Sequence, residues 1–166
     1  IFLIGYMGAG KTTVGKDLAE RMKLSFIDLD CYIEARYHKT VGQIFAEKGE
    51  EAFRDIERRM LQEVSMFEDV LISTGGGAPC FFDNMEFMNA NGTTVSVQEL
   101  AKRLEACKGT RPVLKGRSGE ELVAFIAESL EKRTPFYTKA SIVFDAEVML
   151  TESDVHEISE ALENIL

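Results

Sequence analysis

A glycine-rich loop between an apolar run and a helical pattern constrains this chain more than any other part of the sequence. Residues 5–12 read GYMGAGKT, which matches the pattern G-x-x-x-x-G-K-[ST]. Residues 1–4 are apolar and predict a strand before the loop, and apolar side chains recur at helical spacing over 14–22. Since this pattern requires a strand before it and a helix after it, position and pattern agree on a phosphate-binding loop.

The residue types in the loop indicate a bound nucleoside triphosphate. Glycines allow backbone N–H groups to curl around phosphates, and the start of the following helix adds positive potential. Lys11 is placed to reach the β and γ phosphates, and the Thr12 hydroxyl is placed to bind Mg²⁺. The predicted phosphate-binding residues are Gly8, Ala9, Gly10, Lys11, Thr12 and Thr13. The alternative, a glycine-rich turn without a ligand, is disfavoured by the flanking strand and helix.

Short apolar runs alternate with longer helical patterns along the whole chain, which predicts parallel βαβ units in one α/β domain. Further strands are predicted at 24–27, 70–73 and 142–144, a strand and helix over 93–107, and helices after Gly49, over 120–132 and over 155–166. Pro135 is expected to break or kink the helix before it. A chain of 166 residues can bury one core without disulfide or metal support.

Charge and cysteine content narrow the class of protein. The chain has 28 acidic and 19 basic side chains and a net charge of −9, which disfavours binding to nucleic acid or an anionic membrane. Cys31, Cys80 and Cys107 lie far apart without a C-x-x-C pair, so neither a disulfide framework nor a zinc site is indicated. No apolar run approaches the ~20 residues of a membrane span. A soluble protein of a reducing compartment is therefore expected.

Two groups follow predicted strands, where the strand ends of an α/β sheet face the ligand crevice. Asp28 and Asp30 end the second strand, and their spacing puts both carboxylates on one side of an extended chain. One would support Mg²⁺ and the other would contact the phosphoryl acceptor, although Asp30 could instead cap the following helix. Three glycines at 75–77 expose backbone N–H groups to a ligand, or else form a tight turn without one.

Basic residues stand out at two further places in this acidic chain. Residues 108–119 combine four glycine or proline residues with four basic side chains, which predicts a mobile basic flap. Arg54 lies early in a predicted helix, and Glu57 three residues later could hold its guanidinium in place. Taken alone, such an arginine is usually solvated surface.

Six motifs in order resemble the shikimate kinase family over nearly the whole chain. They are the loop at 5–12, Asp-Leu-Asp at 28–30, Phe-Arg-x-x-Glu at 53–57, the glycines at 75–77, Arg-Pro at 111–112 and Arg-x-Pro-x-Tyr at 133–137. The resemblance implies a P-loop NTPase fold, in which helices flank a five-stranded parallel sheet of order 2-3-1-4-5. Residues 1–166 would form a single domain, with an acceptor-binding part at about 30–60 and a lid at about 108–119.

The resemblance also implies a reaction and its participants. The γ-phosphoryl group of ATP would pass to the 3-hydroxyl of shikimate, with Mg²⁺ as cofactor, in the aromatic amino-acid pathway of the cytoplasm. Lys11 would stabilise the transferred group, Asp30 would orient or deprotonate the attacking hydroxyl, and Arg111 would act as an arginine finger from the lid. Thr12 would bind the metal directly, and Asp28 would hold it through water.

The remaining roles implied by the resemblance concern the acceptor and the base. Arg54 and Arg133 would clamp the carboxylate of the acceptor, and Arg103 would stack on adenine. The implied substrate-binding residues are Asp30, Arg54, Gly75, Gly76, Gly77 and Arg133. ATP and shikimate are the expected ligands of a monomer that binds neither nucleic acid nor membrane.

The sequence departs from the family pattern at one place and leaves other functions open. Residues 93–100 are about four residues short, so that either the strand is truncated or the consecutive numbering passes over residues near Val95–Ser96, and the position of Arg103 depends on this. If the shortening is real, the strand should pass into its helix almost without a turn. Other readings are a kinase for another small anion such as a sugar acid, a nucleoside monophosphate kinase, and a nucleotide-dependent regulatory module. The sequence offers no base-recognising pocket for the second and no asparagine-lysine-x-aspartate box of a GTPase. The acceptor residues argue against the third.

Overall fold

Helices and strands alternate along the chain in a computed structural model that describes residues 1–99, 120–146 and 151–166. The strands are β1 (Phe2–Ile4), β2 (Ser25–Asp28), β3 (Val70–Ser73), β4 (Thr94–Glu99) and β5 (Ile142–Ala146). The helices are α1 (Lys11–Met22), α2 (Leu29–Tyr37), α3 (Val41–Val64), α4 (Asn84–Asn91), α5 (Glu120–Tyr137) and α6 (Glu152–Glu163), with a short 3₁₀ helix η1 (Ala78–Cys80). Cys31 and Cys80 are free thiols, while Cys107 lies outside the described residues.

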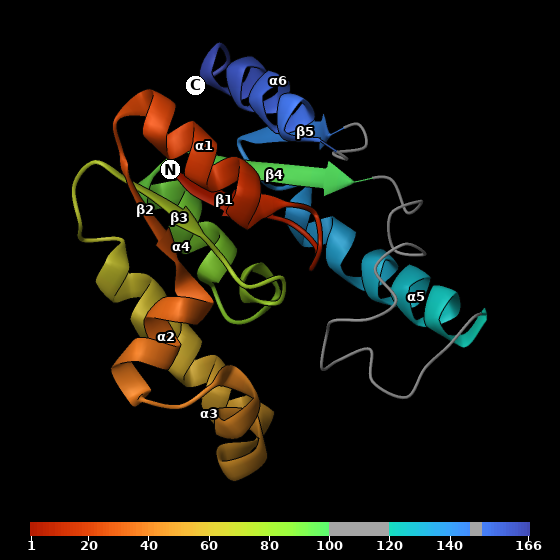
Figure 1. Ribbon diagram of the computed structural model, residues 1–166. Coiled ribbons are helices and arrows are strands. Elements are labelled where there is room, and N and C mark those ends of the chain that lie inside the picture. Colours follow the sequence, from red (N-terminus) through yellow and green to blue (C-terminus); the bar gives the residue numbers. More distant parts are fainter. Residues whose placement is uncertain (100–119, 147–150) are drawn as a thin grey trace.

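All five strands pair in parallel, in the order β2-β3-β1-β4-β5 (Figure 1). This confirms the predicted α/β class and strand order. Strand β1 lies at the centre, where Phe2 pairs with Ile72 of β3 on one side and with Thr94 of β4 on the other. The ends of β1, β2 and β3 therefore meet at one edge of the sheet, which is the edge where parallel sheets bind ligands.

The period of two along the central strand builds the two layers of core. Leu3 of β1 faces the cluster that α1 and α6 cover, and those two helices lie side by side in Figure 1. Phe2 and Ile4 face the opposite cluster, to which α2, α3, α4 and α5 contribute. Since all three side chains are at most 2 % exposed, β1 fixes the position of the loop that follows it.

The predicted arrangement of the two aspartates is wrong. Strand β2 ends at Asp28, and Asp30 already lies in the first turn of α2, so their carboxylates do not share one side of an extended chain. Asp28 is the N-cap of α2 and accepts hydrogen bonds from the backbone N–H groups of Asp30 and Cys31. The alternative that Asp30 caps this helix is wrong as well, because the cap forms two residues earlier. A short acceptor side chain at a strand-to-helix junction binds the first free N–H groups of the helix.

Helix α3 contains the expected helix after Gly49 and also an earlier segment that was not predicted. Gly49 interrupts the helix with φ 78° and ψ 174°, a backbone conformation that favours glycine. The earlier segment begins with a capping box, in which Thr40 and Gln43 bond each other's backbone N–H groups. This Thr-x-x-Gln pattern was a sequence signal for a helix start.

Two further expectations about the C-terminal half, a break of the helix at Pro135 and a truncated strand, are not met. Helix α5 continues through Pro135 to Tyr137, because a proline in the last turn removes only a backbone bond near the helix end. Strand β4 is not truncated, since Val95 and Ser96 pair continuously with β1 and β5. Its passage into the following segment, Arg103, Arg111 and the predicted lid at 108–119 all lie outside the described residues.

Candidate active site

The loop after β1 wraps a buried lysine. Lys11 is 8 % exposed, and its Nζ donates hydrogen bonds to the carbonyl oxygens of Gly5 and Tyr6, each at 2.9 Å. A Cβ at Gly5 would lie 2.4 Å from the carbonyl oxygen of Val97, so only glycine lets the loop pass this close to β4. The loop therefore places its lysine and the start of α1 at the ligand edge of the sheet.

The two predicted metal ligands contact each other. Thr12 Oγ1 donates a hydrogen bond to Asp28 Oδ2 at 2.9 Å, while Asp28 Oδ1 accepts from the backbone of Asp30 at 3.1 Å and of Cys31 at 3.2 Å. A hydroxyl and a carboxylate are hard oxygen donors of the kind Mg²⁺ prefers. Among the described residues, no group of three or more His, Cys, Asp or Glu side chains could hold a metal. The pair thus fits an ion that keeps waters and binds substrate phosphates rather than a closed protein cage.

A cavity of about 440 Å³ joins this loop to the end of β3. It is lined by Met7, Gly8, Gly10, Lys11, Thr12, Thr13, Asp28, Asp30, Ser73, Thr74, Gly75 and Gly76. The structure thus gathers five of the six predicted phosphate-binding residues, all except Ala9, with both aspartates and two of the three glycines around one space.

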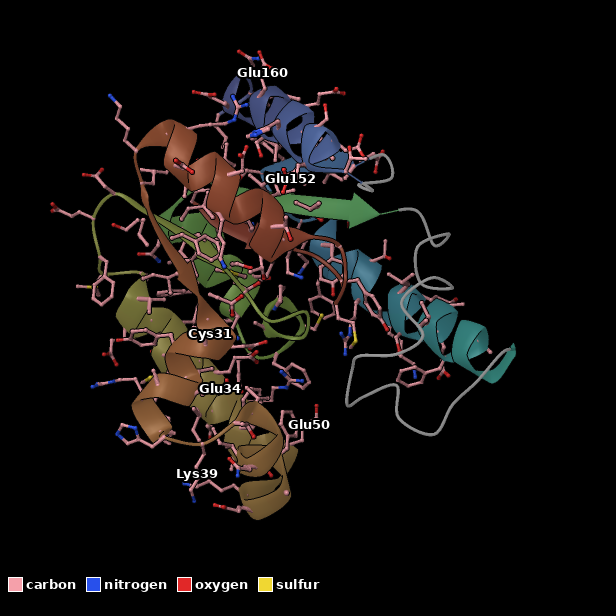
Figure 2. All side chains as sticks on the ribbon, viewed as in Figure 1. Cys31, Glu34, Lys39, Glu50, Glu152 and Glu160 are labelled. Carbon is pink, nitrogen blue, oxygen red and sulfur yellow. The ribbon has the colours of Figure 1, made fainter. Side chains whose placement is uncertain are left out.

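A second hollow of about 410 Å³ shares Thr12 and Thr13 with the first and extends between α1 and α6. Its other lining residues are Lys16, Asp17, Glu20, Glu152, Val155 and His156. Figure 2 shows Glu152 at the start of α6, close to α1. The two hollows together run from the end of β3 across the phosphate loop to α6.

The carboxylates of Asp30 and Glu57 both lie beside Gly75. A Cβ at Gly75 would lie 2.9 Å from Asp30 Oδ1 and equally close to Glu57 Oε1, so the missing side chain makes room for both. Burial raises the pKa of Asp30, and the charge of Asp28 raises it further, whereas Lys11 acts in the opposite direction. A cavity carboxyl with a raised pKa is suited to accept a proton from an acceptor hydroxyl.

Arg54 is buried, which excludes the reading as solvated surface. It is 8 % exposed, and its two terminal nitrogens bind Glu57 Oε2 at 2.7 Å and Glu50 Oε1 at 3.2 Å. The guanidinium carbon lies 4.1 Å from the ring centre of Phe81. A Cβ at Gly77 would come within 2.7 Å of the guanidinium. The glycine run therefore lets Arg54 approach the end of β3.

Glu57 supports this arginine from a position that is 1 % exposed. Its role as the partner three residues along the helix is confirmed by the short contact with Arg54. Burial raises the pKa of Glu57, and the charges of Arg54 and Arg133 oppose that shift. Both arginines thus act on one carboxylate, although Arg133 comes from α5 and is far away in sequence.

Helix α5 contributes two neighbouring side chains to the site. The guanidinium carbon of Arg133 lies 5.4 Å from the ring centre of Tyr6, and Tyr137 Oη donates a hydrogen bond of 2.6 Å to the carbonyl of Gly76. Burial raises the pKa of Tyr137, whereas the charge and hydrogen bond of Arg133 oppose this. Sequence reasoning missed Tyr6, Tyr137, Glu50 and Phe81 as site residues. Tyr6 and Tyr137 had a signal as members of the motifs at 5–12 and 133–137, and Glu50 had its helical spacing of four from Arg54.

None of the helices in the described part of the chain has the length and apolar character of a membrane span.

A family profile described as shikimate kinase matches residues 7–163. A shikimate kinase of Parabacteroides distasonis is 81% identical over 170 aligned positions, which cover 100% of this chain and 98% of that protein.

Two solved structures are similar throughout. A shikimate kinase of Bacteroides thetaiotaomicron has a TM-score of 0.94 and 51% identity, and the match covers 99% of this chain and 96% of the other. A shikimate kinase of Acinetobacter baumannii in complex with shikimate has a TM-score of 0.85 and 28% identity, covering 99% and 90%.

The aligned length also bears on the predicted shortening of the chain. The alignment with the Parabacteroides protein spans 170 positions and includes all of this chain, which has 166 residues, so at least four positions of that relative have no counterpart here. This agrees in size with the shortening predicted within residues 93–100, whose location stays a prediction.

Proposed function

This chain belongs to the shikimate kinase family and phosphorylates shikimate with ATP, and from that premise we propose how the described residues divide the work. The loop side of the cavity holds the triphosphate, and the side formed by α3, α5 and the glycine run holds shikimate. The hollow between α1 and α6 takes the nucleoside, because it opens from the phosphate loop at Thr12 and Thr13.

Arg54 and Arg133 bind the carboxylate of shikimate. The observation on which this rests is the buried guanidinium of Arg54, whose Nε has no hydrogen-bond partner among the described residues. A buried donor without a partner is rare in native proteins, and it suits a ligand oxygen. Arginine is also the side chain whose planar donors match a carboxylate in two places.

Asp30 receives the proton of the attacking 3-hydroxyl, while Lys11 neutralises charge on the transferred phosphoryl group. Thr12 and Asp28 would hold Mg²⁺, which, when bound, offsets the charge that develops on the phosphates. Gly8, Ala9, Gly10 and Thr13 complete the phosphate site, and Gly75, Gly76 and Gly77 the acceptor site.

Other assignments rest on the sequence motifs alone. These are the base contact of Arg103, the arginine-finger role of Arg111, the closure of the segment 108–119, the monomeric state and the cytoplasmic location.

The carboxylate clamp is tested with shikimate and an analogue whose carboxylate is a neutral amide. Truncating one member of a buried charge pair typically costs about 2–5 kcal/mol, so Arg54→Ala and Arg133→Ala should each raise the shikimate Kd at least roughly 30-fold. Calorimetry should show strong discrimination against the amide in the unmodified protein and much less in both variants. Lysine at either position should restore binding only in part.

Arg59→Ala is the matched control, because Arg59 lies on the same helix and is exposed. ATP consumption with and without shikimate should remain coupled in this control. Equal discrimination against the amide in all proteins would show that the two arginines do not read the carboxylate.

A further inference from the structure

Tyr6 contacts both halves of the active site. Its carbonyl oxygen accepts hydrogen bonds from Lys11 Nζ at 2.9 Å and from the backbone N–H of Ala9 at 3.2 Å. Its ring, 6 % exposed, faces the guanidinium of Arg133 at 5.4 Å. One residue of the phosphate loop therefore binds the phosphate-site lysine through its main chain and an acceptor-site arginine through its side chain.

The surroundings of Arg133 differ from those of Arg54. Arg54 is held by the carboxylates of Glu50 and Glu57, whereas Arg133 forms no ion pair with any residue that the structure describes. An aromatic face attracts a guanidinium without neutralising it. The ring of Tyr6 can thus fix the place of Arg133 and leave its charge available to an anionic acceptor.

Tyr137 and Gly76 complete the setting. Tyr137 lies one helical turn after Arg133 and binds the carbonyl of Gly76 at 2.6 Å. A Cβ at Gly76 would lie 3.0 Å from the backbone nitrogen of Met7, so the glycine run packs directly on the phosphate loop. A shift of the loop at Tyr6 and Met7 would therefore displace α5 and the residues of the acceptor pocket.

We propose that Tyr6 is a positioning residue for the acceptor, whose ring holds Arg133 in the shikimate pocket and whose carbonyl ties that position to Lys11. This rests on the acceptor role proposed above for Arg133. When phosphates draw Lys11 toward them, the carbonyl of Tyr6 loses an ammonium partner. The ring and Arg133 then respond, so the affinity for shikimate depends on whether nucleotide is bound.

Calorimetric titration of shikimate, with and without saturating ADP and Mg²⁺, measures both parts of the proposal. Tyr6→Leu removes the aromatic face and should raise the shikimate Kd about tenfold without nucleotide, while the Kd for ADP changes far less. Tyr6→Phe keeps the ring, so its shikimate Kd should lie closer to that of the unmodified protein. The ratio of shikimate Kd values with and without ADP should move toward one in Tyr6→Leu.

Tyr37→Leu is the matched control, since the Tyr37 ring also faces a cation, Lys48 at 5.9 Å, but does not line the cavity. Its shikimate Kd should equal that of the unmodified protein. If Tyr6→Leu melts below the assay temperature, Tyr6→Met removes the ring while retaining apolar bulk and is interpreted in the same way.

A double-mutant cycle separates this inference from the function on which it rests. In an Arg133→Ala background, Tyr6→Leu should raise the shikimate Kd no further, because the ring has no guanidinium left to hold. If Tyr6→Leu changes the shikimate Kd equally in both backgrounds, or in neither, the positioning role is overturned. The carboxylate clamp would still stand in that case, provided that Arg133→Ala alone weakens shikimate binding. An affinity ratio of one in the unmodified protein would overturn the link to Lys11. An unchanged Kd in Arg133→Ala alone would instead overturn the proposed carboxylate clamp.

Discussion

The phosphate side and the acceptor side of the cavity are built by different means. On the phosphate side, Lys11 and its carbonyl partners come from one stretch of seven residues, Gly5 to Lys11, and the lysine is satisfied by the main chain. On the acceptor side, Asp30, Arg54 and Arg133 come from three helices, and Arg54 is held by carboxylates. A phosphate site built from main-chain groups needs only a short motif. A pocket of buried charges needs side chains of opposite charge from distant parts of the sequence.

On the acceptor side, the nearby positive charges do not fully offset the cost of burying the carboxylates. Burial raises the pKa of both Asp30 and Glu57, which means that their charged forms are disfavoured where they stand. Buried charges are costly unless they are paired and hydrogen-bonded. Substitutions on the acceptor side should therefore change shikimate affinity or stability as well as turnover, whereas those on the phosphate side should act mainly through the rate of transfer.

The largest difference between the two sides should come from Lys11→Met. Loss of one positioned cation in phosphoryl transfer should lower kcat at least about 100-fold, as for loss of a preorganised donor elsewhere. The shikimate Kd should change far less than kcat, because Lys11 reaches the acceptor side only through the carbonyl of Tyr6. Steady-state kinetics and calorimetry measure the two quantities, with Lys48→Met as the control, because Lys48 is exposed and lines neither hollow. A variant with near-normal kcat would remove Lys11 from the mechanism.

A smaller effect on the opposite side should follow from Gly77→Ala. The new Cβ would lie 2.7 Å from the Arg54 guanidinium, which must then move, whereas the backbone can accept alanine at φ −89°. We expect the shikimate Kd to rise about tenfold, equivalent to ~1.4 kcal/mol. The melting temperature should stay nearly constant. Gly42→Ala is the control, because its Cβ would meet no atom closer than 3.9 Å. Equal shikimate affinity in both variants would show that Arg54 tolerates displacement.

Asp30→Asn should abolish most activity and yet stabilise the protein above neutral pH. The native state keeps the Asp30 proton to a higher pH than the unfolded chain does, so stability falls as pH rises from near 3.8 through the raised native pKa. Removing this group should raise the free energy of unfolding by about 1 kcal/mol at pH 8.

The gain should vanish below about pH 3, where both states hold the proton. Urea unfolding at the two pH values measures it, with the exposed Asp55→Asn as control. A gain of the same size at both pH values would mean that desolvation of the charged Asp30 carboxylate is not its source.

The smallest expected effect is on stability and concerns two buried hydroxyl groups that belong to neither the phosphate side nor the acceptor side. Ser96 is 0 % exposed, and its hydroxyl has no partner among the described residues, whereas Thr94 Oγ1 two residues earlier accepts from the backbone of Ser141 at 2.8 Å. Thr94→Val should lower the free energy of unfolding by about 1 kcal/mol or more, and Ser96→Ala should leave it unchanged or raise it slightly. Equal losses in urea unfolding would contradict the view that partners decide what a buried polar group costs.

The contrast between short local motifs and contacts of distant residues also explains which parts of the fold and site could be predicted. The strand order came from the family resemblance, and the strands from apolar runs such as Val70–Ser73, whose bounds are confirmed. The pairing of Arg54 with Glu57 had a helical spacing as its signal and is confirmed as a contact.

Other features depend on contacts that no local pattern reveals. Asp28 both ends β2 and caps α2, because the helix begins at the next residue, so the expectations that Asp30 lies in an extended chain or caps the helix were wrong. The contacts of Tyr137 with Gly76 and of Arg133 with Tyr6 join residues more than sixty positions apart. Such pairs exist only after the sheet has brought α5 to the loop.

The two oxygens of Asp28 have separate duties, since one caps α2 and the other accepts from Thr12. An exchange to asparagine would preserve the cap but lose the charge that suits a metal, and an exchange to glutamate would keep the charge but lengthen the side chain beyond the N-cap geometry. Natural variation at this position is therefore opposed by two selection pressures at once, one on folding and one on turnover.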